Sequence, residues 1–191
     1  MSPCDCTMPK GGLTVNIYVD DSNISIGGRR HRYGSPTWDY DPNILGLVIT
    51  HGLPNVGINP YVRKTFSFYG TNLRNPAITK LRGLPHIVTS DSTRNGQGKE
   101  KQADTQLTAD MTEQVIYTYE GRQSAYFIVL SGDADMIPAV KKAVNYGFSV
   151  HVWSWKRSLS PQIIELAGLP AYSELVEIHL LDPWLQVIAL R

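Results

Sequence analysis

The stretch AYFIVLSGDADMIPAV, residues 125–140, decides the fold expected of this chain. Its first part, Ala125 to Leu130, is a short continuous apolar run, which is typical of a strand buried on both faces of a parallel sheet. Residues 136–146 predict a helix, because apolar residues recur there on one face and a glycine follows. Asp133 and Asp135 therefore lie at the carboxyl end of a central strand, the edge where open α/β sheets build their sites.

The two aspartates of this turn have different explanations. Asp135 stands where a helix begins, and aspartate is a favoured residue for capping a helix N-terminus. Asp133 adds a second carboxylate that a tight turn does not require. We therefore expect Asp133 to belong to a site on which other carboxylates converge.

Strands alternate with helices along the rest of the chain. Strands are predicted at 13–19, 64–69, 86–89, 149–155 and 175–181, and helices at 75–82, 102–119 and 160–167. Residues 24–28 fit a helix or a loop, 44–51 fit a helix or a strand, and 91–101 predict an exposed loop. This order predicts an α/β three-layer sandwich with a mainly parallel, Rossmann-like central sheet. Right-handed crossovers place the ends of strands 13–19 and 125–130 side by side at one edge.

The length of 191 residues predicts one domain, residues 13–182, with a flexible tail at 1–12 and a C-terminal extension at 183–191. The only cysteines, Cys4 and Cys6, are too few for a disulfide framework, which favours a reducing, cytoplasmic (intracellular) setting. No apolar run reaches membrane-spanning length and no signal-peptide core is present, so we expect no membrane partner. The five histidines are scattered and no pair has zinc spacing, so the sequence predicts no zinc site.

Acidic side chains follow both central strands directly. Asp20 and Asp21 come after strand 13–19, Asp133 and Asp135 come after strand 125–130, and Asp104 opens the helix between them. Carboxylates brought together in this way repel one another unless protons or a cation neutralise them. Mg²⁺ and Mn²⁺ prefer carboxylate oxygens and water as ligands. The pattern therefore predicts a Mg²⁺ or Mn²⁺ site at this edge of the sheet.

The middle of the chain is basic. Between residues 27 and 101 there are 11 Lys and Arg against 4 Asp and Glu, whereas the rest of the chain has 7 against 13. Such a surface beside a metal site suits the hydrolysis of a phosphodiester in a nucleic acid. Base stacking is expected from Tyr33 and Tyr69. Backbone contacts are expected from Arg29, Arg30, Arg32, Arg94, Lys99 and Lys101.

Three motifs resemble those of the NYN domain family of the PIN-like nuclease superfamily, and they occur in the family's order between residues 15 and 153. IYVDDSN is similar to a strand followed by Asp-x-x-Asn. KQADTQLTADM is similar to a Lys-x-x-Asp helix start with a later Asp-Met, and FIVLSGDADMIPAV to a Ser-Gly-Asp-x-Asp-Phe segment in which Met136 replaces the usual aromatic residue. The matching positions are Asp20, Asn23, Lys101, Asp104, Asp110, Met111, Ser131, Asp133 and Asp135.

The resemblance implies a metal-dependent endoribonuclease, a hydrolase whose partner is RNA. Its metal ligands would be Asp20, Asp104 and Asp133, with Asn23 orienting and Asp135 assisting catalysis. Among the RNA contacts we also expect Ser131. Asp110 lies six residues after Asp104, about 240° around a helix, so both carboxylates cannot face one site and the prediction selects Asp104.

Other functions fit parts of the same pattern. A catalytically silent RNA-binding domain of the same family stays open, because a sequence does not show whether the geometry of the site is productive. A receiver-type phosphotransfer protein would need a lone aspartate after a middle strand, and this chain has two. A haloacid dehalogenase phosphatase would need Asp-x-Asp after its first strand, which DDSN does not supply. The sequence leaves a homo-oligomer open.

Overall fold

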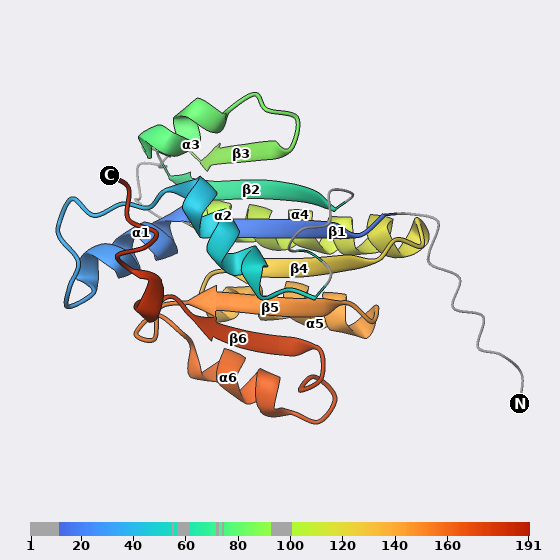
Figure 1. The fold of residues 1–191 in the computed structure, drawn as a ribbon. Helices are drawn as coiled ribbons and strands as arrows, with labels where there is room; N and C mark the ends of the chain where they lie inside the picture. Colours follow the sequence, from blue (N-terminus) through green and yellow to red (C-terminus); the bar gives the residue numbers. More distant parts are fainter. Residues whose placement is uncertain (1–11, 55, 57–61, 72, 74, 93–100) are drawn as a thin grey trace, which may run out of the picture.

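One six-stranded parallel sheet organises the protein in a computed structural model that describes residues 12–54, 56, 62–71, 73, 75–92 and 101–191. The strand order is β3-β2-β1-β4-β5-β6, and every neighbouring pair is parallel, so the strand arrows of Figure 1 all point to the same edge. The bounds are β1 Thr14–Asp20, β2 Arg63–Thr71, β3 Ile87–Ser92, β4 Ala125–Leu130, β5 Ser149–Ser154 and β6 Val176–Leu180.

The strand order reverses between β1 and β4. Thr14 lies opposite Ala125 and Val19 opposite Leu130, while the chain continues from β1 to β2 on one side and from β4 to β5 on the other. This confirms the predicted pairing of the two apolar strands. It also gives the strand order of a Rossmann-like sheet, in which ligands bind outside the carboxyl ends of the strands at the point of reversal.

Helices cover the sheet in two layers, which confirms the predicted three-layer sandwich (Figure 1). One face carries α1 Asp21–Arg30, α2 Pro42–His51 and α3 Pro76–Leu81, and the other carries α4 Lys101–Glu120, α5 Ile137–Asn145 and α6 Pro161–Gly168. Buried apolar side chains of α1 to α3 share one core cluster with β1, and those of α4 to α6 share the second cluster with β4 and β5. The sheet is thus buried between two apolar layers.

Local capping explains where the structure differs from the expected boundaries. Residues 44–51 belong to a helix because the Asp41 carboxylate accepts hydrogen bonds from the backbone N–H groups of Asn43 and Ile44, at 2.8 and 3.4 Å. Residues 24–28 likewise lie within a helix, α1. The loop predicted at 91–101 is wrong at both ends, since pairing with β2 extends β3 through residue 92 and α4 begins at residue 101.

The start of the helix after β4 also needs a correction. A 3₁₀ turn, η1 (Ala134–Met136), precedes α5, and its capping residue is Asp133 rather than Asp135. The Asp133 carboxylate accepts a hydrogen bond from the backbone N–H of Asp135 at 3.0 Å. Asp133 thus has a structural role in addition to the one predicted for it.

The residues expected as a C-terminal extension pack onto the face that carries α1 and α2. They follow the 3₁₀ turn η2 (Asp182–Trp184), and both Leu185 and Ile188 are buried in the core cluster of that face. The indole N–H of Trp38 donates to the carbonyl of Leu185 at 3.3 Å, and a backbone N–H of the segment donates to the carbonyl of Asp39 at 2.9 Å. The segment therefore completes the core around Trp38.

Two adjacent glycines let two tryptophans lie directly against α1. A Cβ atom at Gly28 would overlap the ring of Trp38, and one at Gly27 would overlap the ring of Trp155. The two rings meet edge to face with their centroids 5.6 Å apart, and the indole N–H of Trp155 donates to the carbonyl of Ile24 at 3.0 Å. These contacts hold α1 against the carboxyl edge of the sheet.

We predict that Gly28→Ala lowers the free energy of unfolding by about 1–3 kcal/mol, because the new methyl group forces Trp38 out of its place. Gly52→Ala is the matched control: Gly52 has φ −86°, and a Cβ atom added there would meet open space, with no contact within 4 Å. That control should be neutral or stabilising by about 0.4–1 kcal/mol. Urea denaturation measures both, and equal free energies for the two variants would contradict the tight packing at α1.

Candidate active site

The carboxylate of Asp20 lies at the point where the strand order reverses. Asp20 ends β1 and caps α1, and one of its oxygens accepts a hydrogen bond from the backbone N–H of Asn23 at 3.0 Å. The other oxygen accepts a hydrogen bond from the hydroxyl of Ser131, just after β4, at 3.1 Å. Both side chains are buried, with Asp20 only 7% exposed. This bond joins the two strand ends that the sheet brings together.

The turn after β4 is held from both sides. The backbone N–H of Asp133 donates to the Ser131 hydroxyl at 3.2 Å, and the carbonyl of Gly132 accepts from the backbone N–H of Ser160 at 2.8 Å. Gly132 lies so close to the loop after β5 that a Cβ atom would collide with the carbonyl of Ser158. Ser131 is fully buried against Asp20, which corrects its predicted RNA contact: it positions the carboxylate.

The helix α4 brings a further carboxylate to this edge. Oxygens of Asp104, Asp133 and Asp135 lie within 4.8 Å of one another. Asp20, Asp104 and Asp133 line one cavity of about 370 Å³, whereas Asp135 borders a neighbouring groove along α4. A hard cation holds oxygens at about 2.0–2.6 Å, so its opposite ligands are about 4–5 Å apart. The spacing of Asp104, Asp133 and Asp135 fits a single ion of this class, and Asp20 lies on the wall of the same cavity as Asp104 and Asp133.

Two further observations bear on the fit of a cation. The pKa of Asp20 is raised to about 7, chiefly by burial; the charge of Asp104 contributes to the rise, and the hydrogen bonds from the backbone of Asn23 and from Ser131 oppose it. The side-chain oxygen of Asn23, which lines the same cavity, is buried and has no hydrogen-bond partner among the described residues. The carboxylates of this cavity are the oxygen ligands that a cation such as Mg²⁺ or Mn²⁺ prefers.

Two other aspartates of the motifs, Asp21 in IYVDDSN and Asp110 in KQADTQLTADM, do not face the acidic cavity. Asp21 accepts a hydrogen bond from the hydroxyl of Tyr40 at 2.8 Å, and Asp110 accepts one from the hydroxyl of Tyr69 at 2.8 Å. Neither aspartate lines the cavity that holds Asp104. Tyr69 is buried, which corrects its expected role in base stacking.

Strands β1 and β4 and the acidic groups described above lie within a segment of the chain that matches one known family. The family of the NYN domain matches residues 14–167, most of the chain. The protein belongs to the NYN domain family. This family generally consists of ribonucleases, which usually use divalent metal ions. No curated protein and no solved structure matches the chain. In the parts of this NYN domain that the structure describes, every helix is too short or too polar to cross a membrane.

The three predicted RNA-binding arginines near the end of α1, Arg29, Arg30 and Arg32, do not all border the acidic cavity of the NYN domain. Arg30 lines the acidic cavity, but the guanidinium of Arg29 donates to the carbonyl of Trp38 at 2.9 Å and lies 3.8 Å from an oxygen of Asp39. The guanidinium of Arg32 lies over the ring of an exposed tyrosine, 4.4 Å from its centroid, and does not line the cavity. Arg29 and Arg30 are successive residues of α1 and point in different directions, and Arg32 lies beyond the end of that helix, which corrects the prediction that all three border the site.

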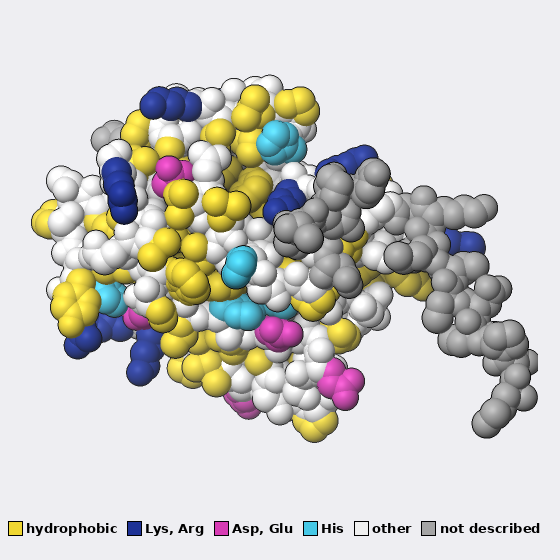
Figure 2. All heavy atoms as spheres, in the orientation of Figure 1, with side chains coloured by type: hydrophobic (Ala, Val, Ile, Leu, Met, Phe, Trp, Pro, Cys, Tyr) yellow, Lys and Arg dark blue, Asp and Glu magenta, His cyan; other side chains and the backbone are white. Residues whose placement is uncertain are grey.

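Three predicted basic contacts fall beyond what the structure describes. Arg94 and Lys99 lie outside the described residues, and Lys101 is described only as the first residue of α4. Figure 2 shows Lys and Arg side chains grouped at the lower left, beside the end of α1. The NYN domain therefore presents positive charge next to the cavity from the described part of the chain alone.

Sequence reasoning missed several residues that line the cavity of the NYN domain. His31, Trp155, Arg157 and Asp182 come from three separate segments. The imidazole of His31 lies 3.4 Å from one carboxylate oxygen of Asp182. The other oxygen of Asp182 accepts a hydrogen bond from the backbone N–H of Lys156 at 2.8 Å. Arg157 and Asp182 could have been found, because each follows a strand that ends at the same edge of the sheet.

We predict that Asp20→Asn stabilises the metal-free NYN domain at neutral and alkaline pH. The folded-state pKa of Asp20, about 7, exceeds its ordinary value of 3.8, so the folded protein binds more protons than the unfolded chain. The stability contributed by protonated Asp20 is complete below pH 3.8, falls as the pH rises, and is lost above about pH 7. Asparagine does not ionise and caps a helix equally well.

The melting temperature of Asp20→Asn in EDTA should therefore rise above that of wild type progressively between about pH 4 and about pH 8. Asp41→Asn makes the same change at the cap of α2 and controls for the loss of a capping carboxylate. A difference between Asp20→Asn and wild type that stays constant with pH would contradict the raised pKa of Asp20.

Proposed function

We propose that this NYN domain is a Mg²⁺- or Mn²⁺-dependent endoribonuclease that hydrolyses phosphodiester bonds of RNA. The observation that carries the proposal is the convergence of Asp104, Asp133 and Asp135 beside the buried carboxylate of Asp20. Membership of the NYN family supports RNA as the substrate. An intracellular, RNA-containing compartment is part of the same proposal.

The cation would be held by Asp20, Asp104 and Asp133, which line one cavity together with Asn23. A bound Mg²⁺ or Mn²⁺ ion would neutralise charge on the scissile phosphate and lower the pKa of a water molecule. A transition metal that prefers nitrogen or sulfur ligands would not suit this set of oxygens.

The chain's own groups would hold the acids and the substrate. Ser131 fixes one oxygen of Asp20, so that carboxylate cannot turn away from the cavity. Arg30 and Arg157 line the cavity and would bind the phosphates that flank the scissile bond. During hydrolysis, the oxygen of a water molecule bonds to phosphorus, and the bond from phosphorus to the leaving oxygen breaks. Asp135, exposed beside Asp133, would accept the proton that the water loses, and solvent would supply a proton to the leaving oxygen.

We predict that Asp104→Asn and Asp133→Asn each reduce RNA cleavage by orders of magnitude while the fold is retained, because each change removes a charged oxygen from the cation site. Asp110→Asn is the matched control. It makes the same substitution on α4, six residues from Asp104 and on a different face of the helix, where the carboxylate bonds to Tyr69 outside the cavity. Cleavage of labelled RNA with Mg²⁺ or Mn²⁺ measures the activity, and a thermal melt of each variant reports the fold.

Wild-type cleavage should stop when EDTA is added. Cleavage that survives EDTA, or an Asp133→Asn protein that cuts at the wild-type rate, would overturn the mechanism. A reversal of the pair, with Asp110→Asn inactive and Asp104→Asn active, would assign the family motif to the other aspartate of α4. If wild type binds RNA but cuts none of several sequences, the domain is the catalytically silent alternative.

We predict that the double variant Arg30→Ala, Arg157→Ala weakens RNA binding and flattens its dependence on salt. Each lost phosphate contact should reduce the slope of log K against log salt by about 0.7 for a single strand. Arg63→Ala, at the opposite edge of the sheet, and Arg29→Ala, whose guanidinium is already bound to Trp38, should leave the slope unchanged. Fluorescence anisotropy at several salt concentrations measures these slopes; an unaltered slope for the double variant would exclude both arginines from the RNA site.

A further inference from the structure

Two histidines and a glutamate meet on the sheet at a place separate from the acidic cavity. His151 is on β5, and Glu177 and His179 are on β6. His151 pairs with Glu177 across the two strands, and His179 lies two residues further along β6, so the alternation of a strand brings all three to one face. Figure 2 shows histidine side chains with an acidic side chain on this face, over β5 and β6.

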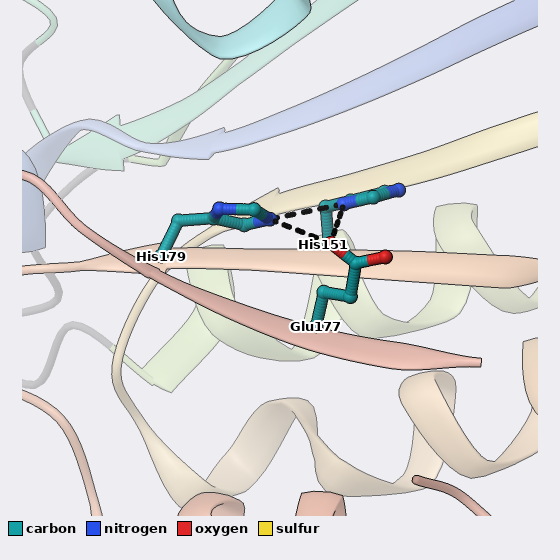
Figure 3. Close-up of side chains that lie close together, drawn as sticks. All are labelled: His151, Glu177 and His179. Atoms are coloured by element: carbon teal, nitrogen blue, oxygen red, sulfur yellow. Dashed lines mark hydrogen bonds and ion pairs between the residues drawn. The ribbon is translucent and has the colours of Figure 1, made fainter. Parts of the chain in front are cut away.

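The three side chains converge on one point (Figure 3). Nδ1 of His151 lies 3.0 Å from Nε2 of His179, and one carboxylate oxygen of Glu177 lies 3.6 Å from each of these nitrogens. A tetrahedral zinc ion holds nitrogen and oxygen ligands at about 2.0–2.2 Å, which places neighbouring ligand atoms about 3.3–3.5 Å apart. The three measured separations bracket that value.

Hydrogen bonding alone does not explain the arrangement. The two imidazole nitrogens share a hydrogen bond at 3.0 Å, but the two contacts of 3.6 Å from Glu177 are ion pairs that are longer than ordinary hydrogen bonds. The side chains of Glu177 and His179 are 63% and 31% exposed, so an ion has access from solvent.

The neighbouring rings hold the two imidazoles in place. The ring of His179 stacks on Trp153 with centroids 4.5 Å apart, and the ring of His151 meets the edge of Tyr126 at 5.6 Å. His151 itself is 4% exposed, so its ring has little freedom to turn. Ligand atoms that are held before the ion arrives lose little freedom on binding.

We propose that His151, Glu177 and His179 form a zinc-binding site that joins the edge strand β6 to β5, with water as the fourth ligand. Two imidazoles and one carboxylate suit Zn²⁺, whereas Mg²⁺ and Mn²⁺ prefer the oxygen ligands of the acidic cavity. Strand pairing, rather than spacing along the chain, brings the three side chains together, so the scattered histidines give no zinc signal in the sequence. The proposed zinc site does not depend on the proposed nuclease activity.

Cobalt can test this site, because four-coordinate Co²⁺ absorbs visible light far more strongly than six-coordinate Co²⁺. The full-length protein, stripped with EDTA and desalted, is titrated with Co²⁺ in excess Mg²⁺, which occupies the acidic cavity. We expect an intense visible band that saturates at one equivalent and is abolished by Zn²⁺. Glu177→Gln and His179→Gln should each weaken binding by more than the roughly 10–100-fold cost of losing an outer-shell partner.

The variant His51→Gln is the matched control, because His51 is an exposed histidine at the end of α2. It should bind Co²⁺ as wild type does. Zinc should also raise the melting temperature of wild type and His51→Gln but not that of Glu177→Gln, whose exposed side chain can change without disturbing the core. A weak six-coordinate spectrum, binding unaffected by Glu177→Gln, or a thiolate charge-transfer band from Cys4 and Cys6 alone would each overturn the proposal.

Discussion

The parallel pairing of β1 with β4 is the constraint on which the site depends. It brings the last residue of β1, Asp20, beside the first residue after β4, Ser131, and a hydrogen bond of 3.1 Å joins them. A carboxylate that is only 7% exposed is costly to ionise, and the neighbouring charge of Asp104 adds to that cost. Positive charge beside Asp20 would therefore stabilise its ionised form. Arg30 lines the same cavity as Asp20.

Much of this arrangement could be predicted from the sequence, because burial on both faces of a sheet requires continuous apolar runs. Those runs identified β1 and β4, and the aspartates that follow them identified the site edge. Helical geometry excluded that Asp104 and Asp110 both face the site, and the structure places Asp104 in the cavity and Asp110 against Tyr69. Membership of the NYN family agrees with the motifs that the sequence presented.

The rest could not be predicted, because it depends on the direction of side chains and on register between strands. Arg29 and Arg30 are adjacent in the sequence, but one bonds to the carbonyl of Trp38 and the other lines the cavity. The three proposed zinc ligands are separated by up to 28 residues, and only the pairing of His151 with Glu177 brings them together. The capping residue after β4 was likewise not predictable. It is Asp133 rather than Asp135, because the Asp133 carboxylate accepts a hydrogen bond from the backbone N–H two residues ahead.

The separation of β1 from β4 along the chain also has a consequence for folding kinetics. Thr14 pairs with Ala125, so more than 100 residues must be gathered before this ladder forms, and no hairpin in the sheet provides a local shortcut. Sheets made of such distant pairings fold slowly, because the chain loses the entropy of closing a long loop before the stabilising contacts form. An early intermediate containing only β1 to β3 would hold Asp20 without Ser131 or Asp133. The acidic centre therefore requires the β1–β4 ladder, and a chain that has not formed this ladder lacks it.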